Sequence, residues 1–99
     1  MKDRAHDESM AELFREDPAF ATHYLNDLLE EGDQADLLMA LRQMAQACGG
    51  VSAIAEKARL NATQLYRTLS AEGNPELRSL AAVLKAMGMR LAIQPIRHT

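Results

Sequence analysis

The stretch VSAIAEKARLNATQLYRTLS, residues 51–70, decides the fold. Its apolar spacing predicts two short helices, over about 51–58 and 62–70, joined by a turn of about four residues. Leu60 in the turn and Leu65 in the second helix are placed to fill the angle between the two helices. This is the pattern of a helix-turn-helix, in which the second helix enters the major groove of DNA.

The outward face of the second helix predicts which side chains read the bases. If Leu65 and Leu69 face inward, then Thr63, Gln64 and Arg67 fall on the opposite face. Gln pairs bidentately with adenine, Arg pairs with guanine, and the Thr methyl packs on a thymine methyl. Tyr66 and the basic residues Lys57, Arg59 and Arg78 are placed to reach phosphates. The expected DNA-binding residues are Ser52, Lys57, Arg59, Asn61, Thr63, Gln64, Tyr66, Arg67, Asn74 and Arg78.

The turn has two notable positions. Asn61 is expected to cap the second helix, and Gln64 is spaced to reach back in the manner of a capping box. Arg59 occupies the position that often holds glycine, where a left-handed backbone would cost about 1 kcal/mol. The alternative interpretation is that both helices are plain core elements of a helical protein.

Helical spacing and breakers predict an all-α protein of five to six short helices. Asp17-Pro18, Gly32 and Gly49-Gly50 separate the leading helices, and Asn74-Pro75 opens the last one. The expected organisation is a single domain over 1–99, with a flexible acidic segment over 1–17 (a short helix within it over 10–16), leading helices over 18–50, the helix-turn-helix over 51–70, a C-terminal helix over 75–88 and a strand over 89–95.

The strand is expected because Met89, Leu91 and Ile93 alternate with polar or small residues, a period of two. A lone strand has unpaired edges. The simplest partner is the same strand of a second copy, which would make these three residues the dimerisation contact of a homodimer. The alternative is an extended tail outside any sheet.

Composition excludes several classes of protein. The chain has 99 residues, 47% of them hydrophobic and 25% charged, which is ordinary for one soluble domain. It has no apolar run of about 20 residues, so no membrane span is expected. No secretory signal is expected either. The single Cys48 indicates a reducing, cytoplasmic setting. The scattered His6, His23 and His98, and the adjacent Glu30-Glu31, form no metal or catalytic pattern, so we expect neither a cofactor nor an enzyme.

Charge divides the chain into two halves. Residues 1–36 contain eleven acids and three bases, a net charge of −8, whereas residues 37–99 contain three acids and eight bases, a net charge of +5. The C-terminal half would suit a polyanion and the N-terminal half a basic partner. The alternative is two solvated faces that happen to differ.

The stretch GGVSAIAEKARLNATQLYRTLSAEGNPELRSLAAVLKAMGMRLAI, residues 49–93, resembles the HigA-like addiction-module antidotes, which are Cro/repressor-type helix-turn-helix regulators. The similarity rests on GG..AIAEKA, LNATQLYRTLS, the GNPEL turn and LKAMGMRL. It extends upstream through YLNDLLEEGDQADLLMALRQMAQACGG, residues 24–50, and covers about residues 18–95. Many members of that family have Ser at the position of Asn61 and Gly at the position of Arg59.

This resemblance implies a lambda-repressor/Cro-like fold and two partners. The protein would be the antitoxin of a type II toxin–antitoxin module, neutralising a RelE/HigB-like toxin. As a homodimer it would also bind a palindromic operator in double-stranded DNA and repress its own operon. The family's recognition helix corresponds to residues 62–70. The alternatives are a helical protein-interaction module and a stand-alone transcriptional regulator without a toxin.

Overall fold

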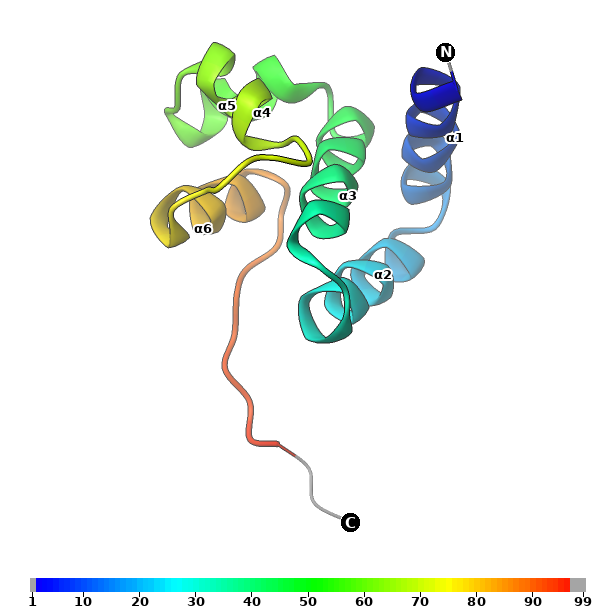
Figure 1. Cartoon of the computed structure of the whole chain (residues 1–99), viewed down its shortest axis with the longest axis vertical. Helices are drawn as coiled ribbons and strands as arrows, with labels where there is room; N and C mark the ends of the chain where they lie inside the picture. Colours follow the sequence, from blue (N-terminus) through cyan, green and yellow to red (C-terminus); the bar gives the residue numbers. More distant parts are fainter. Residues whose placement is uncertain (1, 97–99) are drawn as a thin grey trace.

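The computed structural model describes residues 2–96, and in that part of the chain all regular structure is helical (Figure 1). The all-α class is therefore confirmed. The helices are α1 (Lys2–Glu16), α2 (Pro18–Glu31), α3 (Gln34–Ala47), α4 (Val51–Ala58), α5 (Ala62–Thr68) and α6 (Leu77–Ala86).

Side-chain N-caps determine where the leading helices begin. The Asp17 carboxylate accepts a hydrogen bond from the Phe20 backbone N–H at 3.1 Å, and Pro18 follows at the first helical position. Asp33 accepts in the same way from the Asp36 N–H at 2.9 Å. Because each cap lies one or two residues beyond the preceding helix, α1, α2 and α3 turn sharply on one another.

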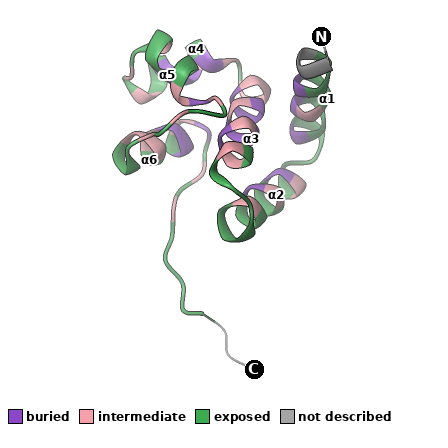
Figure 2. Ribbon diagram, viewed as in Figure 1, coloured by how far each residue is buried: buried purple, intermediate pink, exposed green. Residues whose placement is uncertain are grey.

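Helix α3 lies at the centre of the molecule, since it contacts α1, α2 and α4 (Figures 1 and 2). It contributes a large share of the buried residues, among them Leu38, Leu41 and Ala45. Helix α4 then packs against α5 and α6 on the other side. Residues from every helix therefore join one core, with Phe14 from α1 and Val83 from α6 both 1% exposed.

Helix α1 is longer and better packed than the sequence indicated. We expected a frayed segment before a short helix over 10–16, but the helix begins at Lys2. Its inner face buries Phe14 and Asp7, and the Asp7 carboxylate accepts a 2.9 Å hydrogen bond from the Gln43 side chain on α3. This partner was hidden from sequence reasoning because Asp7 and Gln43 lie 36 residues apart.

The expected strand over 89–95 is wrong. Residues 89–96 are extended but belong to no strand in the described part of the chain. Met89 and Leu91 are half-buried and pack on the chain's own core, while Ile93 is fully exposed. The period of two therefore reflects an extended segment with one side against the protein, and it does not require a ladder of hydrogen bonds.

The last helix begins two residues later than expected. Helix α6 starts at Leu77 with Glu76 before it, so Asn74-Pro75 belongs to the preceding loop and does not cap the helix. Leu77, the first residue of the helix, is 71% exposed. The helix ends at Ala86, two residues before the expected end, and Gly88 stops it: its φ of +82° lets the Met89 N–H donate to the Leu84 carbonyl at 2.8 Å.

Candidate nucleic-acid interface

The turn between α4 and α5 is closed by backbone hydrogen bonds. The Leu60 N–H donates to the Ala55 carbonyl at 2.9 Å, and the Arg59 N–H donates to the Glu56 carbonyl at 3.2 Å. This pattern requires a left-handed residue after the helix. Arg59 takes that conformation, with φ 59° and ψ 44°, and is the only non-glycine residue of positive φ in the described chain.

We expect Arg59→Gly to stabilise the protein by about 0.5–1 kcal/mol. Glycine removes the left-handed strain of 1–2 kcal/mol, although its greater freedom in the unfolded chain offsets part of the gain. Urea unfolding at fixed pH measures the change, with Lys57→Gly inside helix α4 as the control of opposite sign. Equal or lower stability of Arg59→Gly would show that this turn carries no strain.

Asn61 caps α5, as the sequence predicted. Its side-chain oxygen accepts a hydrogen bond from the Gln64 backbone N–H at 2.9 Å. The reciprocal half of the expected capping box does not form among the described residues, so the Gln64 side chain is not used in the cap. That side chain is exposed.

Helix α5 is fixed to the core from one side only. Leu65 is 3% exposed and Leu69 is 1% exposed. The Ser70 hydroxyl donates to the Arg67 carbonyl at 2.6 Å and closes the end of the helix. Thr63, Gln64 and Arg67 are all exposed on the opposite side. Since residues three and four apart share a helix face, they form one outward surface.

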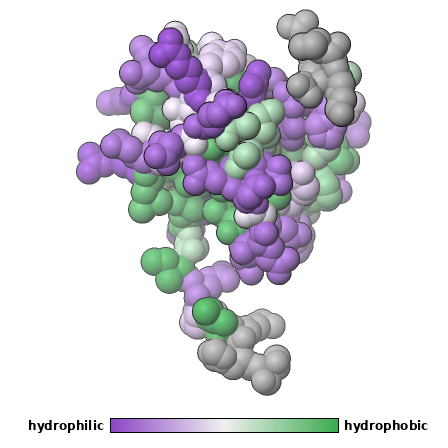
Figure 3. Space-filling view, viewed as in Figure 1, coloured by the Kyte–Doolittle hydropathy of each residue, from purple (hydrophilic) through white to green (hydrophobic). Residues whose placement is uncertain are grey.

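The structure leaves all ten expected contact residues exposed. They come from α4, its following turn, α5, the next loop and the start of α6. These elements lie together on the left of Figure 1, away from α1 and α2, and hydrophilic residues dominate their upper part in Figure 3. Within the described residues, none of the bases in the set forms an ion pair with an acid, because the single salt bridge joins Arg15 to Glu12.

Other groups offer little chemistry. Burial raises the pKa of the Cys48 thiol, while the charges of Lys57 and Arg15 oppose that shift less strongly. The thiol is therefore held in its protonated, weakly nucleophilic form at neutral pH. No group of three or more potential metal ligands occurs in the part of the chain that the structure describes.

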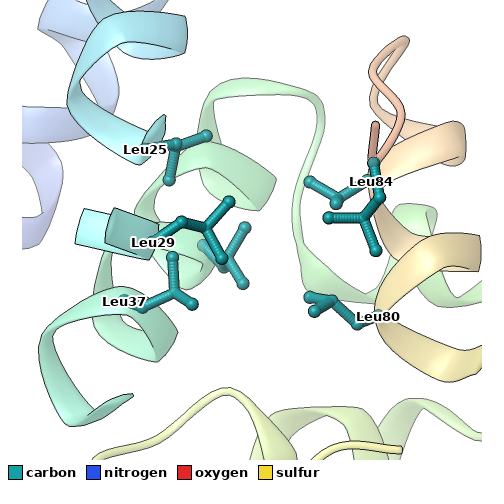
Figure 4. A pocket seen from close by; sticks show the side chains of 7 residues that line it. Leu25, Leu29, Leu37, Leu80 and Leu84 are labelled. Atoms are coloured by element: carbon teal, nitrogen blue, oxygen red, sulfur yellow. The ribbon is translucent and has the colours of Figure 1, made fainter. Parts of the chain in front are cut away.

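Two structural features escaped the sequence reasoning. The Gln34 side chain donates a 3.0 Å hydrogen bond to the Gly73 carbonyl, which attaches the loop after α5 to the start of α3. Leucines of α2, α3 and α6, together with Leu91, line a small apolar hollow of about 20 Å³ (Figure 4). The regular leucine spacing of these helices was visible in the sequence, but the spacing alone gives no sign that a hollow remains between them.

Comparison with known proteins places the chain in a family. A family model described as "Probable addiction module antidote protein" matches residues 6–95. A protein of Haemophilus influenzae described as uncharacterized is 35% identical over 74 residues, covering 75% of each chain. No solved structure gives a significant match. None of the described helices could cross a membrane, being too short or too polar. With nine-tenths of its length matched, this chain belongs to the family of probable addiction module antidote proteins.

Proposed function

We propose that the protein is the antitoxin of a type II toxin–antitoxin module that also represses its own operon. The single observation that carries the DNA-binding part is the outward face of α5, where Thr63, Gln64 and Arg67 are exposed on a helix anchored from behind. The antidote family implies a toxin partner. For the type of toxin, the support is the charge of the leading helices. For DNA binding, the support is the geometry of α5 and the basic charge around it.

On DNA, α5 would lie in the major groove with Gln64 and Arg67 at base edges. Lys57, Arg59 and Arg78 would meet phosphates on either side. Two copies on a palindromic operator would place their α5 helices roughly 34 Å apart, one turn of DNA. The residues that would touch DNA all lie in the half of the chain that carries a net charge of +5.

For the toxin, the proposal is a small basic protein of the RelE/HigB kind. Residues 16–41 contain seven acids and neither lysine nor arginine. This stretch covers all of α2 and the first two turns of α3, on the opposite side of the molecule from α5 (Figure 1). Opposite charge would steer association with a basic toxin while leaving α5 free for DNA.

Titration of operator DNA at several salt concentrations tests the DNA-binding proposal. The probe is a labelled duplex of the region upstream of the protein's own gene, with a shuffled duplex of equal composition as control. We expect tight binding of the first duplex only, with log K falling linearly as log salt rises, because each neutralised phosphate releases a counterion. Equal affinity for both duplexes, or none for either, would contradict the repressor function.

A second candidate is an interaction module that masks the toxin without binding DNA. The acidic stretch over 16–41 favours it, because that charge needs no operator to explain it. Absence of operator binding together with tight binding of a basic toxin would favour this candidate.

A further inference from the structure

The loop between α5 and α6 returns to the leading helices and is bonded to the start of α3 (Figure 1). There the Gln34 side-chain N–H donates to the Gly73 backbone carbonyl at 3.0 Å, although the two residues are 39 positions apart in the sequence. In the described part of the chain, this is the only side-chain hydrogen bond between residues 2–50 and residues 51–96. The hydrogen bonding that attaches this loop to the leading helices therefore depends on one side chain.

The loop needs this bond because its own backbone bonding is sparse. Among residues 71–76 of the described chain, only the Gly73 N–H donates to a backbone carbonyl, that of Ser70 at 2.9 Å. The Ser70 hydroxyl in turn donates to the Arg67 carbonyl at 2.6 Å, so the series of bonds runs from Gln34 to the end of α5. A surface segment with so few hydrogen bonds opens easily when one of them is removed.

Gln34 reaches the loop from a fixed position. It is the first residue of α3, and the Asp33 carboxylate caps that helix by accepting a hydrogen bond from the Asp36 N–H at 2.9 Å. Within EEGDQAD, residues 30–36, only Gln34 has a side chain with an N–H donor. A carboxylate in its place would repel the Gly73 carbonyl, so the bond depends on the amide at position 34.

The loop leads directly to two of the expected DNA contacts. Asn74 follows Gly73, and Arg78 lies in the first turn of α6, where the loop ends. Both side chains are exposed. Gln34 itself has four acids within residues 30–36, and their charge repels phosphates, so we do not expect it to touch DNA. Any effect of Gln34 on operator binding must therefore act through the loop.

We propose that Gln34 is a positioning residue for operator binding. Its hydrogen bond holds the loop over 70–76 in the arrangement that presents Asn74 and Arg78 to phosphates beside α5. Without the bond, the loop samples other arrangements, and the apparent affinity for DNA falls in proportion to the population of the competent one. The inference rests on the proposed function and adds to it a residue of the leading helices that does not itself touch DNA.

Amide hydrogen exchange of the full chain without DNA, measured by NMR, tests the attachment of the loop. Gln34→Met keeps the length of the side chain but removes its donor, and we expect the Gly73 N–H to exchange about 3–10 times faster. Gln34→Lys returns an N–H donor of similar reach and should restore slow exchange. Gln94→Met makes the same change in the exposed tail, so this matched control should leave the Gly73 rate unchanged.

Titration of the upstream duplex tests the effect on DNA binding. Gln34→Met is expected to weaken binding about 3–10-fold, whereas Gln94→Met should not alter it. In a chain that already has Asn74→Ala and Arg78→Ala, adding Gln34→Met should weaken binding by less than about twofold, because the loop then has no contact left to position. A role of Gln34 in general stability would instead lower the affinity equally in both backgrounds.

Unchanged exchange of the Gly73 N–H in Gln34→Met would overturn the inference, and so would an equal loss of affinity in the two backgrounds. If the unsubstituted chain binds its operator and Gln34→Met binds it equally well, the inference fails while the proposed function stands. If the unsubstituted chain has no operator affinity, the proposed function fails, and the positioning role fails with it. The two failures are distinguishable because only the second is seen without any substitution.

Discussion

Gly73→Ala is expected to lower the free energy of unfolding by about 3 kcal/mol or more, which is large for a single methyl group on a surface loop. A Cβ at Gly73 would lie 1.7 Å from the Thr68 carbonyl oxygen and 2.6 Å from its carbon. Those atoms belong to the end of α5, so no flexible side chain can move aside. The clash can be relieved only by shifting the loop or unwinding the helix end.

The loop cannot shift without further loss. The Gly73 N–H donates to the Ser70 carbonyl at 2.9 Å, and the Gly73 carbonyl accepts the bond from Gln34 on α3. Displacement of Gly73 therefore breaks the Gln34 hydrogen bond that attaches the loop after α5 to the start of α3. For a domain of this size, a loss of 3 kcal/mol corresponds to a fall of roughly 12–24 °C in melting temperature, which calorimetry measures directly.

Two variants separate this clash from other effects. Gly88→Ala introduces only left-handed strain, since φ is +82° and nothing lies within 4 Å of the added carbon, so about 1 kcal/mol is expected. Glu72→Ala, next to Gly73 and exposed, should change stability by less than about 0.5 kcal/mol. If Gly73→Ala cost no more than Gly88→Ala, the close approach to Thr68 would be disproved.

The contrast between Gly73 and Gly88 also shows how far the sequence could predict this fold. Gly88 follows an apolar helical stripe, so its role as a helix end is readable from neighbours along the chain. Gly73 is required by a carbonyl five residues away in a turn that has no regular period. Features set by neighbours along the chain were predictable, such as α4 and α5, whose positions follow from local spacing and the Asn61 cap. Features set by distant contacts were not, such as the burial of Asp7, whose partner is far away in the sequence.

For the candidate site, the sequence predicted which residues would be exposed but not what they touch. Thr63, Gln64 and Arg67 face outward because Leu65 and Leu69 must face inward, which is a consequence of helical period alone. The strand predicted over 89–95 was wrong because alternation alone does not show what an extended segment contacts. An extended segment shows the same alternation whether it pairs with a strand or lies with Leu91 against its own chain, and only the surrounding leucines decide between them.

The double variant Gln64→Ala/Arg67→Ala is expected to weaken operator binding by about 3 kcal/mol, roughly 100-fold, without loss of stability. Each bidentate contact to a base edge contributes about 1–3 kcal/mol of discrimination. Neither side chain supports the fold, because both are exposed and the cap on α5 uses only the Gln64 backbone. Arg67→Ala alone should cost about 1–3 kcal/mol and relax the preference at one base pair of each half-site.

Lys85→Ala is the matched control for charge. Lys85 is an exposed base on α6 outside the expected contact set, so its removal should alter operator affinity far less than removal of Arg67. Quantitative gel shifts on the operator and on single-base variants measure both affinity and preference. If Arg67→Ala and Lys85→Ala weakened every duplex equally, α5 would be attracting phosphates without reading bases. Unchanged affinity of the double variant would show that neither Gln64 nor Arg67 reads the bases, and only Thr63 and Tyr66 of the expected contacts on α5 would remain to be tested.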